Sequence, residues 1–208
     1  MNPFTHVQSV AAPMPDADID TDIIFPARFL VLTQKAGLGP YAFYEKRFDE
    51  QGRERSDFVL HRTPWRGAAI LVAGANFGCG SSREQAPWAL ADLGVRCIVA
   101  PSFGEIFQTN CFNNGMLPIT LPLAEYARVL AAAQAGQTLA VDLNECSITL
   151  PAAPPIAFSI AERARQSLLT GCDEIERIRQ EADASITEFE LRQRHSQPWL
   201  YVDLHPND

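Results

Sequence analysis

Apolar and polar positions follow three different patterns along the chain of 208 residues. Residues 1–65 are irregular: a short strand is predicted near 5–10, and the prolines, aspartates and glycines that follow predict long loops with short helices. Residues 67–136 alternate short apolar runs with amphipathic stretches, and from 138 onward apolar residues alternate with polar ones. Long loops in compact domains often carry function, so the first segment is a candidate binding region.

The middle segment has the pattern of repeated βαβ units. Its apolar runs predict strands at 69–73, 97–100 and 117–121. The helices predicted between and after these strands end at Gly94, Gly115 and Gly136. Helices that connect consecutive strands favour a parallel sheet, whereas the alternating segments after residue 138 predict antiparallel strands. We therefore predict an α/β fold with mixed parallel and antiparallel strands flanked by helices.

The last part of the chain predicts two helices and a polar tail. The first helical pattern stops at Gly171, and the second starts at Asp173 with Glu176 as its capping-box partner. We divide the chain into an α/β domain at 1–160 and a helical C-terminal extension with its tail at 161–208. The apolar residues near the end are Trp199, Leu200, Tyr201 and Leu204. They indicate either a strap that docks on the chain's own surface or a contact with a partner.

Charge and composition exclude several classes of function. The net charge of −8 is spread along the whole chain, which disfavours binding to nucleic acid or to anionic lipid. With 47% hydrophobic residues and no long apolar stretch, the composition is that of a globular protein and not of a membrane-spanning one. The basic residues are nearly all arginines, so one site could still hold a small anion bidentately.

Cysteines and histidines are too scattered to predict a metal site on this chain alone. The five cysteines are odd in number and contain no C-x-x-C pair, and two of the four histidines lie in the polar tail. Any metal must therefore come from elsewhere. The first residues have neither the basic patch nor the apolar core of a signal peptide, so we expect a cytoplasmic protein with free thiols.

The most informative segment is the glycine-rich turn at 74–85, between a predicted buried strand and a predicted helix. Ser81 or Ser82 would form a capping box with the residue three positions later, so we expect the helix to begin at one of these serines. A cap alone does not need three glycines, which here are Gly74, Gly78 and Gly80. Glycine lets the backbone approach another group closely, and the N–H groups of a helix start attract anions. The turn therefore predicts an anion site.

Three known motifs do not fit this turn. A P-loop needs Lys before its last Ser or Thr, but Cys79 and Gly80 precede Ser81. A dinucleotide fingerprint and a nucleophile elbow both need Gly at the position of Arg83. A serine hydrolase in the usual chain order would have to take its histidine from the polar tail, which disfavours that class.

Several segments resemble a known family. Residues 76–84, Asn-Phe-Gly-Cys-Gly-Ser-Ser-Arg-Glu, resemble the active-site loop of the swivelling domain of the aconitase superfamily, and residues 109–119 resemble its second characteristic segment. Residues 20–30 and 86–90 narrow the resemblance to the free-standing small subunits of 3-isopropylmalate dehydratases. The resemblance covers nearly the whole chain and implies the swivelling β/β/α fold. At one position the family commonly has His where this chain has Gln85, so no proton-carrying role is implied there.

The resemblance implies a hydro-lyase reaction of leucine biosynthesis. Water is removed from 2-isopropylmalate to give isopropylmaleate and is added back to give 3-isopropylmalate. In the family the [4Fe-4S] cluster lies on an iron-sulfur large subunit, so this chain would carry no cofactor and would act in a heterodimer with that subunit. By similarity Ser81 is the base, acting as an alkoxide, Arg83 holds a carboxylate of the malate-type substrate and Ser82 donates a hydrogen bond.

A second group of candidates precedes the glycine-rich turn. Arg28 either holds a second substrate carboxylate or belongs to a surface ion pair. Asp20 and Asp22 either orient this arginine or cap a helix. In the resembling family the loop after Arg28 faces the variable group of the substrate, and the alternative is a short buried helix with its exit loop. The apolar side chains that would contact an isopropyl group are Leu30, Val31 and Leu32.

Three further residues have structural interpretations, and two other functions remain open. We expect Asn110 to fix loop backbone, Cys79 to be a small packed residue and Trp88 to lie in the core. One alternative function is a non-catalytic module that binds a dicarboxylate without turnover, and the other is a cofactor-free enzyme that works alone. Within the superfamily, the small subunits of homoaconitase and of citraconate hydratase are alternatives for the substrate.

Overall fold

The computed structural model of the chain describes residues 1–172 and 174–201. Contacts divide the chain into two units, residues 1–171 and the part from Cys172 onward. The sheet and the helices α1 to α6 belong to the first unit, and α7 belongs to the second. No helix in the described ranges is both long enough and apolar enough to cross a membrane.

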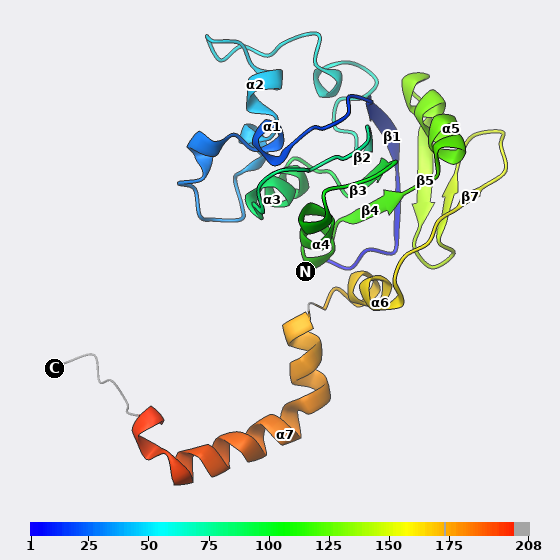
Figure 1. Ribbon diagram of the computed structural model, residues 1–208. Helices are drawn as coiled ribbons and strands as arrows, with labels where there is room; N and C mark the ends of the chain where they lie inside the picture. Colours follow the sequence, from blue (N-terminus) through cyan, green and yellow to red (C-terminus); the bar gives the residue numbers. More distant parts are fainter. Residues whose placement is uncertain (173, 202–208) are drawn as a thin grey trace. The chain divides into compact units, whose positions relative to one another are not determined.

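The described residues of the first unit form one seven-stranded sheet with the order β4-β3-β2-β1-β5-β6-β7 (Figure 1). The strands are β1 (His6–Met14), β2 (Ile70–Ala73), β3 (Cys97–Ala100), β4 (Leu117–Thr120), β5 (Thr138–Asp142), β6 (Ser147–Thr149) and β7 (Ile156–Ala157). The pairs β1–β2, β2–β3 and β3–β4 are parallel. The pairs β1–β5, β5–β6 and β6–β7 are antiparallel. The predicted mixture of parallel and antiparallel strands is confirmed.

Helices connect the strands and cover the sheet. The α-helices are α1 (Thr21–Ile24), α2 (Tyr44–Arg47), α3 (Gln85–Asp92), α4 (Glu105–Asn113), α5 (Leu123–Gln134), α6 (Glu162–Thr170) and α7 (Glu174–Ser196). Short 3-10 helices are η1 (Ala27–Phe29), η2 (Gly39–Tyr41), η3 (Val59–His61) and η4 (Pro198–Tyr201). The irregular segment between β1 and β2 contains α1, α2 and three of these 3-10 turns, as the pattern of residues 1–65 predicted.

The parallel strands contribute to two separate cores, because successive residues of a strand face opposite sides of the sheet. On one side Leu71 and Ile98 pack with residues of α1, α3 and α4. On the other side Ile70 and Val72 pack with residues of α5 and the antiparallel strands. Figure 1 shows α3 and α5 on opposite sides of the sheet. Since both faces are covered, these strands are continuous apolar runs and not alternating ones.

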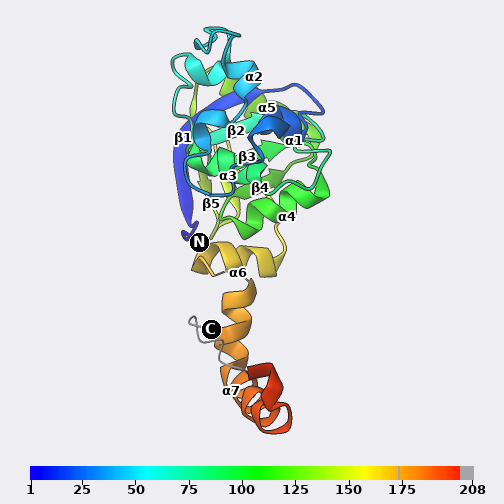
Figure 2. The same cartoon turned by 90° about the vertical axis from the view of Figure 1, so that its left-hand side faces the viewer.

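Strand β1 joins the two halves of the sheet. Its first residues pair with β5, and its last residues, Ala11 to Met14, pair with β2 (Figure 2). Because β1, β2 and β3 are parallel, their carboxyl ends lie at the same edge. The loops that follow these three strands therefore meet at that edge, which is where ligands bind in many open α/β sheets.

The structure confirms the predicted helix ends but not one predicted helix start. Gly94, Gly115, Gly136 and Gly171 all have positive φ and follow α3, α4, α5 and α6. Helix α3, however, begins at Gln85, and its N-cap Glu84 makes no side-chain capping bond. The capping box predicted at Ser81 or Ser82 is therefore wrong, because contacts with another loop hold these residues outside the helix.

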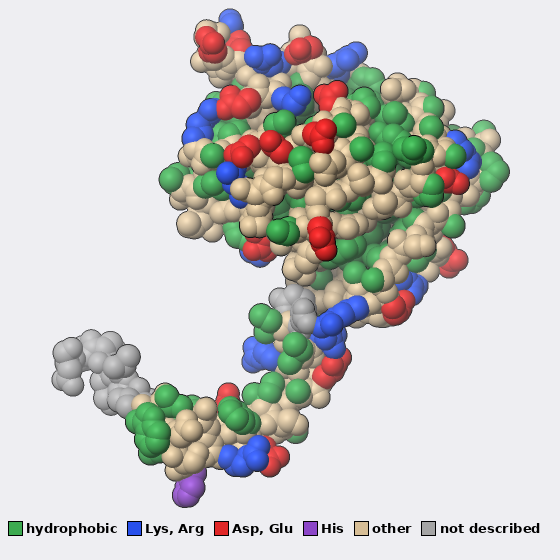
Figure 3. Space-filling model, viewed as in Figure 1, with side chains coloured by type: hydrophobic (Ala, Val, Ile, Leu, Met, Phe, Trp, Pro, Cys, Tyr) green, Lys and Arg blue, Asp and Glu red, His purple; other side chains and the backbone are tan. Residues whose placement is uncertain are grey.

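The described residues of the second unit form α7 and η4. This unit begins at Cys172, so α6 belongs to the first unit, and the division predicted at residues 160 and 161 stays a prediction. Tyr201 donates a hydrogen bond to Gln193 Oε1 at 2.6 Å, and the guanidinium of Arg194 lies 4.8 Å from the ring centroid of Tyr201. Trp199 and Leu200 are 67% and 56% exposed within the described structure. Figure 3 shows hydrophobic and charged side chains interspersed along α7. The predicted helix start at Asp173 and the apolar residue Leu204 lie outside the described residues.

Candidate active site

The glycine-rich loop, residues 74–84, runs from β2 to α3 and is bonded to the chain on both sides. On one side Gly78 N donates to Ile19 O at 2.7 Å, and Thr21 N donates to Cys79 O at 2.9 Å. On the other side Gly104 N donates to Phe77 O at 2.9 Å. These bonds continue the pairing of β1, β2 and β3 beyond the strand ends. The backbone of the glycine-rich loop is therefore fixed at residues 77–79 without any ligand.

Packing within the chain explains two of the three glycines. A Cβ at Gly74 would lie 2.2 Å from the carbonyl oxygen of Asp16. A Cβ at Gly78, where φ is +73°, would lie 2.2 Å from the ring of Phe107. The close approach that the sequence predicted is thus an approach to the chain itself. At Gly80 φ is +91° and the nearest atom to an added Cβ is 3.6 Å away, so only the backbone conformation favours glycine there.

Ser81 and Ser82 are exposed at the end of this loop. The carbonyl of Ser81 accepts a hydrogen bond from the hydroxyl of Thr21 at 3.0 Å, which fixes the backbone but leaves the Ser81 hydroxyl out of the contact. Within residues 1–172 and 174–201, neither serine hydroxyl has a hydrogen-bond partner, and the N–H groups of Gly80, Ser81 and Ser82 donate to no other group. A hydroxyl beside free N–H donors is an arrangement that can stabilise an oxyanion.

Arg83 is held by a carboxylate from the neighbouring loop. Its Nη1 forms an ion pair with Asp22 of α1, and its side chain is 20% exposed. Asp20 caps α1 by accepting a hydrogen bond from Ile23 N at 2.7 Å. The capping interpretation of Asp20 is confirmed. Asp22, by contrast, orients Arg83 and not Arg28.

Arg28 lies in a different environment. It forms an ion pair with Glu45 of α2, and both side chains are more than half exposed. Its guanidinium also lies 4.7 Å and 5.1 Å from the ring centroids of Phe29 and Tyr44. The structure therefore shows the surface ion pair that the sequence offered as one interpretation of Arg28. Substrate binding by this residue stays a prediction.

The three apolar candidates after Arg28 do not share one environment. Val31 is 83% exposed, whereas Leu30 and Leu32 are both half-buried and pack against the core. Val31 and Leu32 line a cavity of about 370 Å³, together with Tyr41, whereas Leu30 does not. The alternative of a short buried helix is wrong for Val31. Contact with the substrate stays a prediction for all three residues.

Sequence reasoning missed the polar residues that link these segments. Among the described residues, Thr21 is the one polar residue that is buried as a whole, backbone included, and its hydroxyl bonds the backbone of the glycine-rich loop. Asn114, and not Asn110, uses its side chain to fix backbone: it donates to the carbonyl of Asn110 at 2.8 Å. A polar residue between two aspartates, and an asparagine at a predicted helix end, were the available signals.

Cys79 and Trp88 fit their structural interpretations only in part. Cys79 is half-buried, and its pKa is raised by desolvation first and then by the charges of Asp18 and Asp20. Trp88 packs against the core but is half-buried, and its indole N–H donates to Asn114 Oδ1 at 2.9 Å. A raised pKa keeps the Cys79 thiol protonated, which does not favour a nucleophilic role.

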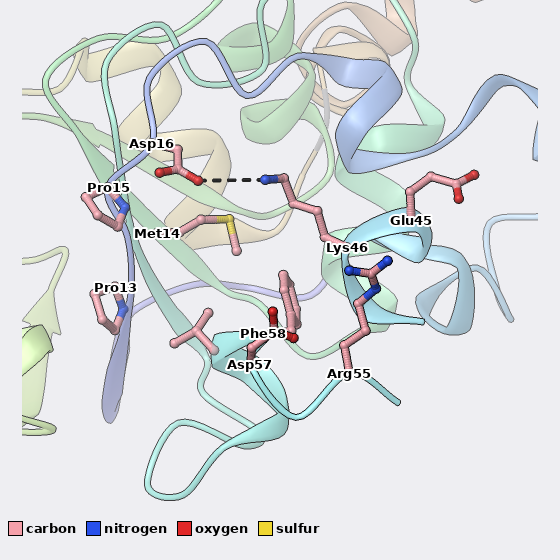
Figure 4. Close-up of a pocket in the computed structure, with 10 residues that line it drawn as sticks. Pro13, Met14, Pro15, Asp16, Glu45, Lys46, Arg55, Asp57 and Phe58 are labelled. Carbon is pink, nitrogen blue, oxygen red and sulfur yellow. Dashed lines mark ion pairs between the residues drawn. The ribbon is translucent and has the colours of Figure 1, made fainter. Parts of the chain in front are cut away.

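A second hollow lies beside the carboxyl end of β1 (Figure 4). It has a volume of about 380 Å³ and is lined by the end of β1 and the two residues that follow it, by α2, and by the segment that leads into η3. Lys46 and Asp16 form an ion pair across it, with 3.7 Å between Nζ and Oδ2. None of the site residues predicted from the sequence is among those that line this hollow.

The described residues offer no place for an iron-sulfur cluster. No three Cys, His, Asp or Glu side chains in this part of the chain come together in a way that could hold a metal ion. Cys97 and Cys111 are fully buried, and burial raises the pKa of both thiols, which disfavours thiolate ligands. No metal ligand is therefore assigned among the described residues.

Known proteins are similar to this chain over nearly its full length. The aconitase C-terminal domain family matches residues 1–124. The 3-isopropylmalate dehydratase small subunit of Rhodospirillum rubrum is 49% identical over 97% of this chain and 98% of its own length. That of Dinoroseobacter shibae is 47% identical over 96% of this chain and all of its own length.

A solved structure supports the fold. The crystal structure of 3-isopropylmalate dehydratase from Methanocaldococcus jannaschii has a TM-score of 0.65 and 24% sequence identity, and the match covers 88% of this chain and 99% of that chain. At this identity the likeness concerns the fold alone, and it agrees with the predicted swivelling α/β domain. The family match over residues 1–124 and the identities of 47% and 49% show that the chain belongs to the aconitase C-terminal domain family, among the 3-isopropylmalate dehydratase small subunits.

Proposed function

We propose that this chain works with a large subunit to convert 2-isopropylmalate to 3-isopropylmalate through isopropylmaleate, a hydro-lyase reaction of leucine biosynthesis. The observation that carries the proposal is the exposed Ser81 hydroxyl, which lies beside unbonded N–H groups in the described structure on a loop with a fixed backbone. Relatives with 49% and 47% identity bear the name of this dehydratase subunit.

In this proposal Ser81 is the base that removes the substrate proton. A serine hydroxyl is a weak base unless its anion is stabilised. The N–H groups of Gly80, Ser81 and Ser82 are donors that the fold holds in place, so they can stabilise the alkoxide without reorganisation. Ser82 assists as a hydrogen-bond donor to the substrate. Thr21 contributes indirectly, because its bond to the Ser81 carbonyl fixes the backbone that carries the hydroxyl.

Arg83 binds a substrate carboxylate in the same proposal. Its planar guanidinium can form two parallel hydrogen bonds to a carboxylate, and its pairing with Asp22 fixes the direction of the side chain. Arg28 holds the second carboxylate, in exchange for its exposed contact with Glu45. Leu30, Val31 and Leu32 contribute the apolar environment for the isopropyl group, and the cavity of about 370 Å³ that Val31 and Leu32 line supports this role for those two residues.

The cluster belongs to the partner in this proposal. A [4Fe-4S] cluster on the large subunit supplies the Lewis acid for the departing hydroxyl, since this chain's described residues hold no ligand set for it. The small-subunit name of the relatives implies such a large partner. We place the resulting heterodimer in the cytoplasm, where a reducing environment fits the absence of a disulfide at Cys79, Cys97, Cys111 and Cys146.

Reconstitution with an anaerobically prepared iron-sulfur large subunit tests the proposal. We expect turnover of 2-isopropylmalate, with weaker use of homocitrate-type and citramalate-type acids. Preferred use of one of those acids would instead favour a homoaconitase or citraconate hydratase subunit. Binding of a dicarboxylate without turnover would support the non-catalytic module, and turnover by this chain alone after chelation and desalting would support a self-sufficient enzyme.

A further inference from the structure

Asn114 makes four hydrogen bonds with one side chain. Its Oδ1 accepts from Trp88 Nε1 at 2.9 Å and from Lys35 Nζ at 3.2 Å. Its Nδ2 donates to Glu84 Oε1 at 3.0 Å and to the carbonyl of Asn110 at 2.8 Å. A carboxamide has two donor hydrogens and two acceptor lone pairs, so the hydrogen-bonding capacity of Asn114 is fully used.

The partners of Asn114 determine which residue can stand at this position. Lys35 and Trp88 can only donate, whereas the Glu84 carboxylate and a backbone carbonyl can only accept. The amide therefore cannot be turned over, and no other side chain of this size supplies both an acceptor and two donors. An aspartate would lose both donors and would place a second carboxylate against Glu84.

These bonds join two segments that are far apart in the sequence. Lys35 belongs to the loop that contains Val31 and Leu32, and its ammonium also lies 4.8 Å from the ring centroid of Trp88. Glu84 directly follows Arg83 at the start of α3. Asn114 lies at the end of α4, in the segment 109–119 that the proposed function does not use. The Asn114 side chain thus bonds both the loop at residues 31–38, which we call the cavity loop, and Glu84, the residue that follows Arg83.

We infer that Asn114 is a positioning residue that fixes the loop at residues 31–38 relative to the turn at Arg83 and Glu84, and that this spacing sets the selectivity for the alkyl group of the substrate. The catalytic part of this inference rests on the proposed function. The structural part does not, because the bonds lie within this chain.

Hydrogen exchange on the full chain tests the structural part. In Asn114→Ala we expect amide exchange to rise at least about fivefold in peptides from both 30–38 and 81–88, because both segments lose their common partner. Asn113→Ala is the matched control, since Asn113 is exposed and directly adjacent. It should change neither peptide. Faster exchange in only one segment, or in neither, overturns the inference.

Variants of Lys35 separate this role from general stability. Lys35→Met removes the bond to Asn114 and the cation contact with the Trp88 ring, and it should loosen residues 30–38 only. η2 stays attached through the bond of 2.7 Å from Gly39 N to Asp92 Oδ2. Lys35→Arg keeps a cationic donor and should restore slow exchange. In the Asn114→Ala background, Lys35→Met should add less than it does in the unaltered chain, because the bond to Asn114 is already gone and only the contact with the Trp88 ring is left to lose. Additive effects of the two changes would contradict the inference.

Kinetics of the reconstituted enzyme test the catalytic part. The measured quantity is kcat/KM for 2-isopropylmalate divided by kcat/KM for a malate-type acid with a methyl group in place of isopropyl. Asn114→Ala should lower this ratio about tenfold, the size expected from losing one or two hydrogen bonds, with most of the change in KM. Asn113→Ala should leave the ratio unchanged. An equal loss for both substrates would mean that Asn114 is only structural, whereas inactivity of the unaltered enzyme would refute the proposed function and leave the exchange experiment to decide on Asn114.

Discussion

The glycine-rich loop and the cavity loop at residues 31–38 are held in different ways. Backbone bonds to Ile19, Thr21 and Gly104 fix the first loop on both sides, and two of its glycines pack against the chain. The second loop is exposed at Val31, and it is held by side chains: Lys35 bonds Asn114, and Leu32 and Leu38 pack in the core that α3 and α4 share. Adding a Cβ at Gly37 meets nothing within 4 Å.

This difference separates two tasks of one active site. A base that must be stabilised as an anion requires donors that are already in place, because reorganisation during the reaction would cost free energy. A pocket for an alkyl group has a weaker requirement, since one or two methylenes change the free energy by only about 1 to 3 kcal/mol. A fixed loop for chemistry and a more open loop for selectivity are therefore what the proposed reaction needs.

The largest effect is expected from Ser81→Ala. Turnover in the reconstituted enzyme should fall at least about a thousandfold, because the change removes the base. Folding and association with the large subunit should be unaffected, since Ser81 is exposed. The thermal unfolding temperature and a binding assay are the controls. Near-normal turnover would end the assignment of Ser81.

Alanine at Gly78 and at Gly37 compares the two loops directly. Gly78→Ala should lower the free energy of unfolding by about 3 to 4 kcal/mol, because the new Cβ would meet the Phe107 ring and φ is positive. Gly37→Ala, where φ is +83° but space is open, should cost about 1 kcal/mol. Urea denaturation measures both. Equal losses would show that the glycine-rich loop is no more constrained than the cavity loop.

Arg83→Lys tests the fixed carboxylate site. A lysine keeps the charge but cannot form two parallel bonds to a carboxylate. We therefore expect kcat/KM to fall by an amount that corresponds to a loss of roughly 2 to 4 kcal/mol of transition-state stabilisation. The ion pair with Asp22 can persist, which keeps the loop folded. Steady-state kinetics with 2-isopropylmalate give the answer. Unchanged kinetics would mean that Arg83 is only structural.

Arginine at Val31 or Leu32 tests the cavity loop, where the effect on stability should be smallest. Val31→Arg should leave unfolding nearly unchanged, because Val31 is 83% exposed. The same variant should lower kcat/KM for 2-isopropylmalate relative to that for a homocitrate-type acid at least about tenfold. The bound substrate would cover the charge of the new arginine, and an alkyl group cannot compensate that charge whereas a carboxylate can. Leu32→Arg should act in the same direction. If neither change alters the ratio, this loop does not contact the substrate.

The sequence predicted the regular elements better than the connections between loops. Apolar runs and glycine stops located β2, β3, β4 and the ends of α3 to α6, because burial and positive φ depend on local sequence. The cap at Ser81 was predicted wrongly, because the hydroxyl of Thr21, sixty residues away, holds this backbone outside the helix. The glycines were assigned to a ligand because Phe107 could not be known to lie against Gly78.

In the candidate site, too, contacts between residues far apart in the sequence could not be predicted. Residues 76–84 could be singled out from their own composition and from the family resemblance. The partners of the charged groups could not, because the pairs Asp22 with Arg83 and Glu84 with Asn114 join positions that are 61 and 30 residues apart. The first pair forms because the loops after the parallel strands β1 and β2 meet at one edge of the sheet, and the second because the start of α3 lies against the end of α4.

The most direct measurement is a titration of the large subunit with this chain. The initial rate of isopropylmaleate formation from 2-isopropylmalate is followed at a fixed concentration of anaerobic, cluster-loaded large subunit. We expect no turnover from either protein alone and a rate that rises to a plateau at an equimolar ratio, because Ser81 and the cluster lie on different chains. Turnover by the large subunit alone, or a rate that does not depend on added chain, would contradict the claim that this chain supplies the catalytic base.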